Sequence, residues 1–266
     1  MTEVLYDNAP LVEVIVEVRW ETVSVSTIPG GAIDPYLKPT LQELQTRMAA
    51  NGFAHHETLI PNEIPRELLA YQITDRFRRT PSSWPIFQIG PGVFTVNITP
   101  PYGGWSSFTP FIQQGIELLL ESFPAPSQLM KVKECRLRYI DAFTQAHTRI
   151  DHLEFLTRGL GLNLSIGHGK PSEPITTEKL TDLSASMVYN MGISNSKLHV
   201  QIGSGFSSGT PATVVTLEAI STRNSEAPES TKLLEWYESA HSDLSATFES
   251  LLSQDVKNAM GKRRDQ

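Results

Sequence analysis

Leu11-Val12-Glu13-Val14-Ile15-Val16-Glu17-Val18-Arg19-Trp20 is the most strongly patterned stretch of the chain. Four valines and Trp20 alternate with Glu13, Glu17 and Arg19, so that one side is apolar and the other carries charges. Alternation with a period of two residues is typical of a strand that buries one face against a core. We therefore expect a long strand with one apolar face and one charged face.

A second stretch of the same character, from Val132 to Phe143, predicts another long strand in the second half of the chain. Its Arg138-Tyr139 follows Arg19-Trp20 by 119 residues, and Gln201-Ile202-Gly203 follows Gln88-Ile89-Gly90 by 113 residues. These near-equal separations predict an internal duplication of the chain.

Each half is expected to follow the order β-α-β-β-β-α, with the halves at residues 1–126 and 127–266. The first half is predicted to contain strands at 11–20, 68–74, 85–89 and 93–98, a helix at 37–51 and a helix that begins at Ser106 or Ser107. The second is predicted to contain strands at 132–143, 184–193, 197–202 and 212–220, a helix at 150–160 and a helix from 231. The expected fold class is α+β: duplicated halves that form one or more curved antiparallel sheets, with helices packed on one face.

Composition and charge exclude several classes of protein. The chain has 266 residues and a net charge of −7, whereas a general nucleic-acid binder needs a surplus of Lys and Arg. Its one cysteine, Cys135, excludes a disulfide framework and a multi-cysteine metal or iron–sulfur site. The first residues have no basic and apolar leader pattern, and no apolar run is long enough for a membrane span. We expect a cytoplasmic protein.

The charged sides of the two long strands supply the first candidate site. If the strands lie side by side, Glu17 and Arg19 are expected opposite Arg138 and Arg136. One interpretation is a ladder of ion pairs on a solvated face, which adds little stability. The other is a concave polar floor that grips an anionic or peptide ligand. The pattern favours the ladder.

Two aromatic segments supply further candidates. Arg76, Arg78 and Arg79 precede Trp84, and arginine beside aromatic rings is typical of a protein hot spot or a single-stranded nucleic-acid site. The negative net charge favours a protein partner, and a solvated loop is the competing interpretation. In Tyr102-Gly103-Gly104-Trp105, the two rings are either an exposed anchor or a plug between sheet and helix.

Other motifs predict structure rather than chemistry. The glycine-rich 203–209 segment is followed by Pro211 and a β-branched strand, which favours a hairpin over a phosphate loop. Cys135 lies within a strand pattern typical of a buried hydrophobe. The histidines lack the spacing of a metal site. We therefore predict no catalytic residue, no metal site and no cofactor.

The order of these motifs resembles a sporadically distributed family of bacterial proteins of this length, a conserved family without an established function. The resemblance is carried by 10–14 with Glu17 and Arg19, by 87–90, by 102–105, by 137–140 and by Trp236, His241 and Phe248 in the last helix. It covers nearly the whole chain. Patchy distribution implies mobile genes, such as toxin–antitoxin or defence genes, and no functional residue is carried over.

The sequence therefore predicts a non-catalytic protein-interaction module, the neutralising or accessory partner of a toxin or defence effector encoded in the same operon. Charge complementarity with a basic partner would raise the rate and specificity of association. One alternative is an enzyme or small-ligand receptor that uses the polar strand face. A third is a single-stranded nucleic-acid binder that uses Arg76–Arg79 and Trp84. A homodimer through the last turns of the terminal helix is a further expectation.

Overall fold

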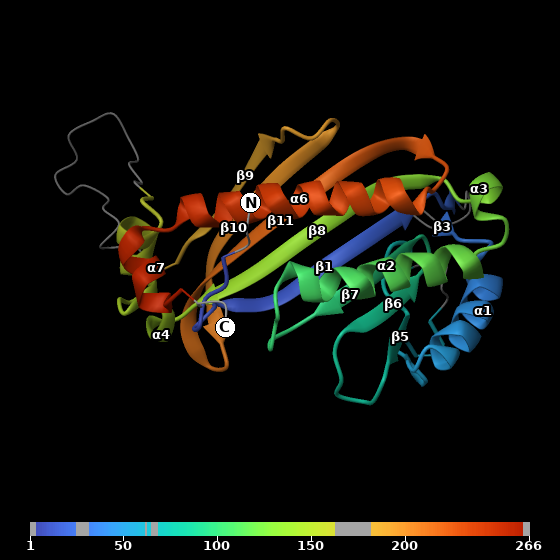
Figure 1. Ribbon diagram of the computed structural model, residues 1–266, viewed down its shortest axis with the longest axis horizontal. Helices are drawn as coiled ribbons and strands as arrows, with labels where there is room; N and C mark the ends of the chain where they lie inside the picture. The colour runs from blue at the N-terminus through green and yellow to red at the C-terminus, as the bar shows by residue number, and fades with distance from the viewer. Residues whose placement is uncertain (1–3, 25–31, 62, 65–68, 163–181, 263–266) are drawn as a thin grey trace.

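One antiparallel sheet organises the protein. The computed structural model describes residues 4–24, 32–61, 63–64, 69–162 and 182–262. Nine strands form the sheet in the order β4-β5-β6-β7-β1-β8-β11-β10-β9, and every neighbouring pair is antiparallel (Figure 1). The expected α+β class with a large antiparallel sheet is confirmed.

The elements have the following bounds in the structure. The strands are β1 (Leu11–Trp20), β2 (Val23–Ser24), β3 (Ala32–Ile33), β4 (His55–Thr58), β5 (Asp75–Arg78), β6 (Ile86–Gly90), β7 (Val93–Ile98), β8 (Val132–Phe143), β9 (Ser184–Asn190), β10 (Ser196–Ser207) and β11 (Thr210–Glu226). The helices are α1 (Leu37–Ala50), α2 (Trp105–Ser122), α3 (Pro126–Leu129), α4 (Gln145–Thr148), α5 (His152–Glu154), a π-helical turn (Phe155–Gly159), α6 (Ser230–Leu251) and α7 (Gln254–Met260).

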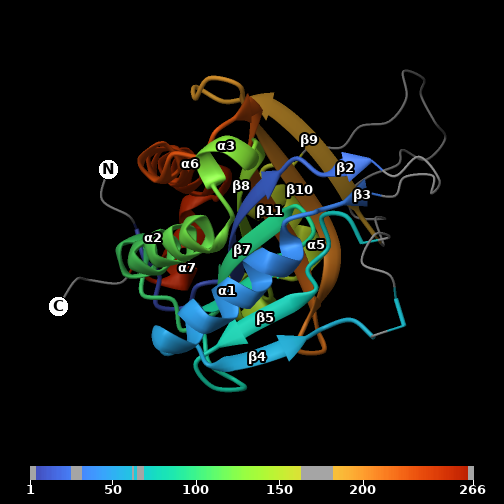
Figure 2. The same ribbon diagram turned by 90° about the vertical axis from the view of Figure 1, so that its right-hand side faces the viewer.

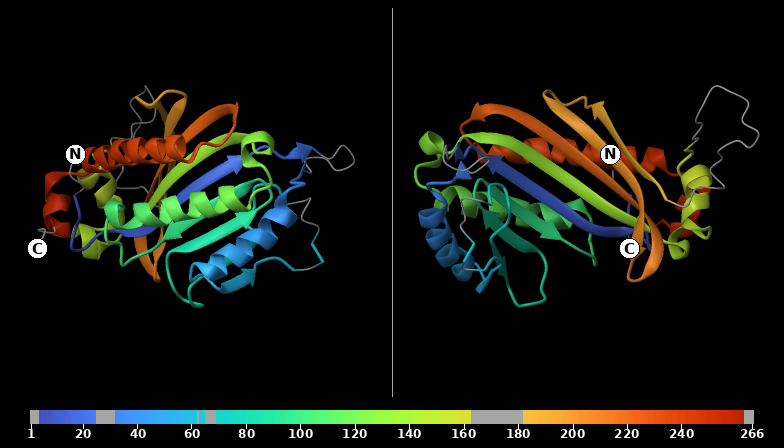
Figure 3. Two further views of the ribbon diagram at one scale, coloured as in Figure 1. Left: turned by 45° about the vertical axis from the view of Figure 1, so that its right-hand side comes forward. Right: turned by 180° about the vertical axis from the view of Figure 1, so that it is seen from behind.

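The two long strands predicted from the alternating pattern, β1 and β8, lie side by side at the centre of the sheet. Val14, Val16, Val18 and Trp20 of β1 are all buried, because they face the helices. Helices α1, α2 and α6 pack on that face, and the view from behind shows the strands in front of α2 and α6 (Figures 2 and 3). Among the described residues, the sheet therefore has one face covered by the long helices and one face without them, the helix-free face.

Outside the central pair, the strands run in reverse chain order on both sides. From β1 outward they are β7, β6, β5 and β4, and from β8 outward they are β11, β10 and β9, so β4 has no counterpart. A long helix follows the strands of each half, α2 after β7 and α6 after β11. Apolar residues from both halves form one continuous core.

Several expected elements differ in the structure. The expected strand at 68–74 is wrong: residues 69–74 form turns and irregular backbone, the strand begins at Asp75, and Leu68 lies outside the described residues. Strand β4 was not predicted, because His55-His56-Glu57-Thr58 has no apolar alternation. The helix expected at 150–160 is a three-residue helix followed by the π-helical turn.

The helix ends also correct two expectations. Gly104, with a φ of 94°, precedes the first residue of α2, so Ser106 and Ser107 lie inside the helix. The last turns of the chain do not project as a dimerisation arm. They form α7, whose Val256 and Met260 are buried in the core. Within the part of the chain that the structure describes, no helix combines the length and apolarity needed to cross a membrane.

Candidate ligand-binding site

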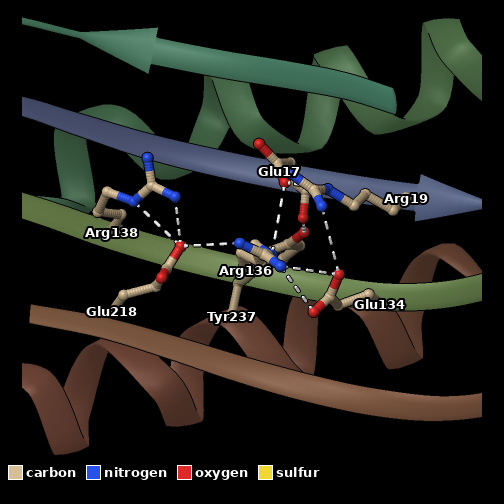
Figure 4. A network of polar contacts seen from close by, with 7 residues as sticks. All are labelled: Glu17, Arg19, Glu134, Arg136, Arg138, Glu218 and Tyr237. Atoms are coloured by element: carbon tan, nitrogen blue, oxygen red, sulfur yellow. Dashed lines mark hydrogen bonds and ion pairs between the residues drawn. The ribbon is translucent and has the colours of Figure 1, made fainter. Parts of the chain in front are cut away.

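The helix-free face of the central strands carries a network of ion pairs (Figure 4). Glu17 lies opposite Arg136, and Arg19 lies opposite Glu134. Arg19 Nε is 2.5 Å from Glu17 Oε1, and Arg136 Nη2 is 3.0 Å from Glu134 Oε1. The expected register, with Glu17 and Arg19 opposite Arg138 and Arg136, is wrong by two residues. It would place two guanidinium groups opposite each other, whereas the observed register pairs opposite charges.

A third strand completes this network through a residue that sequence reasoning missed. Glu218 of β11 lies opposite Arg138, and its Oε1 is 2.5 Å from Arg138 Nη2 and 3.5 Å from Arg136 Nη1. Burial opposes the charge of Arg136, but hydrogen bonds to Glu134 and the charges of Glu218 and Glu17 outweigh burial and raise the pKa of the guanidinium. A lone carboxylate in an apolar strand was the signal for Glu218.

The network is therefore neutral within itself, with three carboxylates and three guanidinium groups: Glu17, Glu134, Glu218, Arg19, Arg136 and Arg138. Tyr237 of α6 donates a hydrogen bond of 2.6 Å to the backbone carbonyl of Glu17, which ties the helical layer to this strand. The geometry fits the ion-pair ladder better than a floor that offers free charge to a ligand.

The arginine cluster of β5 is divided between different partners. Arg76 and Arg78 both lie within 4 Å of Glu57 on the neighbouring strand. The Arg78 guanidinium also stacks over Trp84, at 5.4 Å from the ring centroid. Arg79 lies over the rings of Phe53 and Phe111 instead. Arg78 and Trp84 thus come together, but the three arginines do not form one patch.

The two aromatic residues near the start of α2, Tyr102 and Trp105, have different surroundings. Trp105 is only 5% exposed, stacks on His241 with ring centroids 4.4 Å apart, and donates through Nε1 to Glu238 at 2.6 Å. It is therefore the plug between helices α2 and α6 and not an exposed anchor. Tyr102 lines a pocket.

That pocket has a volume of about 490 Å³ and lies on the helix side of the sheet. Its walls come from the segment before β1, the loop before α2, strands β8 and β11, and helix α6. Apolar side chains such as Leu11, Leu217 and Leu244 form much of the lining. Pockets of this size, apolar with a few polar groups, are typical of small-molecule sites.

Most polar groups of the pocket have a partner within the protein. Tyr6 donates to Glu249 Oε1 at 2.7 Å, and Lys257 lies 3.6 Å from Glu249 Oε2. Burial and Glu249 raise the pKa of Tyr6. Tyr139 Oη and His241 Nδ1 are 2.8 Å apart. Burial lowers the pKa of His241 to about 4, against the opposing effect of Glu238, so the ring is neutral at pH 7.

Asp141 is the exception in this pocket. It is 4% exposed, lies on β8 between Leu11 and Val215, and shares the helix-facing side of the strand with Tyr139. Among the described residues, no side chain or backbone group forms a hydrogen bond or an ion pair with its carboxyl. Burial raises the pKa of Asp141 to about 7.

Sequence reasoning missed this pocket, although the signal for Asp141 was present. Residues 137, 139, 141 and 143 share one face of the predicted strand, and an aspartate there places an acid on the apolar side. No family model, no curated protein and no solved structure matches this chain in the comparisons with known proteins. The resemblance to the sporadically distributed bacterial family stays a prediction.

Proposed function

We propose that this protein is a small-ligand receptor whose site is the pocket beside Asp141. One observation carries the proposal: a carboxyl that is 4% exposed and has no protein partner among the described residues lines a pocket of about 490 Å³. Buried polar groups are satisfied in nearly all native structures, and exceptions cluster at functional sites. A ligand that satisfies Asp141 gives a reason for this exception.

A small-ligand receptor was one of the alternatives that the sequence indicated. The sequence placed its site on the polar strand face, whereas we place it in the pocket. The polar strand face fits that role less well, because its six charged side chains already neutralise one another. The pocket instead combines an apolar wall with one unsatisfied carboxyl. This combination supports binding of a ligand that is apolar except for one polar group.

A polarity-sensitive dye tests the proposal. Ser245 lines the pocket and Ser242 lies exposed on the same helix, so Ser245→Phe fills the pocket and Ser242→Phe is its matched control. The neutral dye 6-propionyl-2-dimethylaminonaphthalene should bind the wild type and Ser242→Phe, with blue-shifted and several-fold brighter emission. Ser245→Phe should lose this signal at an unchanged melting temperature. Equal emission from both variants, or none from the wild type, would contradict the proposal.

We also propose a second function, the interaction module indicated by the sequence, because of the edge strand β9. Val188 and Tyr189 of β9 are 54% and 51% exposed, and Phe206 of the adjoining hairpin is 75% exposed. An edge strand presents backbone groups to which an extended segment can pair. The net charge of −7 favours a basic partner, such as a toxin or defence effector from the same operon.

Copurification tests this second function. The chain is expressed with the neighbouring operon gene as wild type, as Val188→Asp and as Val23→Asp. Val23 is the control, since it is 60% exposed, close to the 54% of Val188, but belongs to the separate two-stranded sheet of β2 and β3. The partner should be retained by the wild type and by Val23→Asp and lost from Val188→Asp. Retention of the partner by the wild type and by both variants would exclude β9 as the docking edge.

We further propose that residues 1–126 and 127–266 descend from one duplicated unit. The reversed chain order of three strands on each side of the β1–β8 pair, β7-β6-β5 and β11-β10-β9, supports this origin. So does the long helix that follows the strands of each half. The duplication would explain why the two strands with the charged alternation meet at the centre of the sheet.

A further inference from the structure

We infer that the pocket takes an organic cation, a protonated amine on a compact apolar body, with Asp141 as its counter-ion. This inference rests on the proposed receptor function and names the chemistry of the ligand. It follows from the charges of the pocket, from its aromatic walls and from the protonation of its one unsatisfied carboxyl.

The charges that line the pocket are negative. Asp7, Asp141 and Glu249 contribute carboxylates, and no Lys or Arg lines it in the ranges that the structure describes. His241 of α6 faces the same space but is neutral. Lys257 of α7 lies 3.6 Å from Glu249 Oε2, and Glu249 Oε1 accepts a hydrogen bond from Tyr6.

Asp141 is the lining carboxyl for which the described residues provide neither a hydrogen-bond donor nor a cation. An ionised carboxylate in an apolar site is costly unless a cation or several donors accompany it. A ligand ammonium supplies both a positive charge and up to three N–H donors. An anionic ligand would face the three carboxylates without a lining cation, so the geometry opposes anions.

Aromatic rings around the carboxyl suit the same chemistry. Tyr6, Tyr102, Tyr139 and Phe248 all line the pocket. The faces of such rings attract ammonium groups, more strongly where water is displaced. Leu11, Leu217 and Leu244 offer contact to an apolar body. The pocket therefore suits an arylalkylamine in the charge and in the apolar and aromatic character of its lining.

Protonation of Asp141 makes the inference testable by pH. Around pH 7 the carboxyl changes from neutral to ionised. A cation binds the ionised form, so its affinity should rise about tenfold from pH 6 to pH 8, as the ionised fraction rises from about one tenth to about nine tenths. A neutral ligand accepts a hydrogen bond from the protonated form and gains nothing at high pH. Tyr139, His241, Tyr6, Asp7, Glu249 and Tyr102 are the other titratable groups that line the pocket.

Three matched probes distinguish the ligand classes by calorimetry: 2-phenylethylamine, 2-phenylethanol and 3-phenylpropanoate. The amine should bind the wild type with the tenfold rise between pH 6 and pH 8. The alcohol should bind weakly without this rise, and the carboxylate should not bind. Asp141→Asn should reduce the affinity for the amine at pH 8 at least tenfold and remove its pH dependence. Glu121→Gln, which removes an exposed carboxylate of α2 outside the pocket, should leave both unchanged.

The outcomes separate this inference from the receptor function. Equal affinity for amine and alcohol at pH 8, or an amine affinity that is unchanged in Asp141→Asn, overturns the cation and keeps the pocket as a receptor site. Dye binding without amine binding has the same meaning. Failure of the dye and of all three probes overturns both proposals.

Discussion

Strand β8 carries ionisable side chains on both of its faces, and the two faces treat charge in opposite ways. On the helix-free face, Arg138 lies 2.5 Å from Glu218, and Arg136 lies within 4 Å of three carboxylates. On the helix side, three residues beyond Arg138, Asp141 has no partner among the described residues. On the helix-free face, each charged side chain is paired with an opposite charge of the protein. On the helix side, the carboxyl of Asp141 is left without such a partner among the described residues.

The difference separates a structural charge from a functional one. Charges that pair across neighbouring strands fix the register and present little free charge to a ligand. A buried carboxyl without a partner is costly to ionise. Its ionisation therefore lowers the free energy of unfolding of the protein. Removing a carboxylate should therefore have opposite effects on the two faces of the sheet.

The largest expected effect is at Asp141. Its pKa is raised from 3.8 to about 7 in the folded protein, so the folded state binds more protons than the unfolded state between these values. The free energy of unfolding therefore falls as pH rises through that window. Asp141→Asn removes this loss, so the variant should gain roughly 2 kcal/mol relative to the wild type between pH 5.5 and pH 8.

Urea unfolding of both proteins at pH 5.5 and pH 8 measures this gain. Asp151 caps α5 at the surface, and backbone hydrogen bonds lower the pKa of its carboxyl, so Asp151→Asn is a control that should not gain stability at pH 8. A stability difference between wild type and Asp141→Asn that stays constant across the two pH values would mean that Asp141 is compensated.

A smaller effect of opposite sign is expected at Glu218. Glu218→Gln keeps the shape of the side chain but removes the charge that Arg138 and Arg136 contact. Because the guanidinium groups are only partly exposed, the loss should be about 1.5 kcal/mol at pH 8, between the values for exposed and buried pairs. Chemical denaturation at pH 8 provides the measurement. A variant as stable as the wild type would mean that water replaces Glu218 at no cost.

Salt offers the matching control for this comparison. The exposed pair of Arg47 with Glu121 joins α1 to α2, and Glu121→Gln should cost less than the Glu218 variant. Screening weakens exposed pairs more than partly buried ones. In 1 M NaCl the Glu121 effect should vanish, whereas part of the Glu218 effect should remain.

The sequence predicted the strands that carry the ion-pair network better than it predicted the pocket, for a physical reason. Strand bounds at 11–20 and 132–143 are correct to the residue, because alternation is a local property of each strand. The sequence suggested the pairing of β1 with β8 only as a condition for the charged site; the two strands do pair, in a register two residues from the expected one. Opposite charges set that register, and applying charge complementarity to both strands would have found it.

The pocket depends on contacts that no local pattern contains. Its walls come from residues 4–11, the loop before α2 and the distant helix α6. Alternation alone placed Asp141 on the apolar side of its strand. The sequence does not show that its carboxyl lacks a partner. This depends on the residues that surround it in the fold, which include Leu11, Val215 and His241. Strand β4 was missed for a different reason. Its residues are polar, and they form a strand because they pair with β5.

A further pH effect concerns His241, which shares the pocket with Asp141 and shifts stability with pH in the opposite sense. Its pKa is lowered from 6.5 to about 4, so the unfolded state binds more protons in this window and stability falls as pH falls from 6.5 towards 4. The Asp141 effect runs the other way over most of the same range, and the two offset each other in the wild type. His241→Phe keeps a ring against Trp105 and removes the acid-side loss of stability, together with the hydrogen bond to Tyr139.

The stability of His241→Phe relative to the wild type should therefore rise as pH falls from 6.5 to 4.5, measured by urea unfolding at each pH. The lost hydrogen bond to Tyr139 shifts this difference by a constant and leaves its slope with pH intact. The double variant with Asp141→Asn should lose both slopes. A constant difference between His241→Phe and the wild type would show that the ring is as easily protonated in the folded protein as in the unfolded chain. The ring would then be mainly a cation below pH 6.5, and a cationic ligand beside Asp141 would face its charge at pH 6.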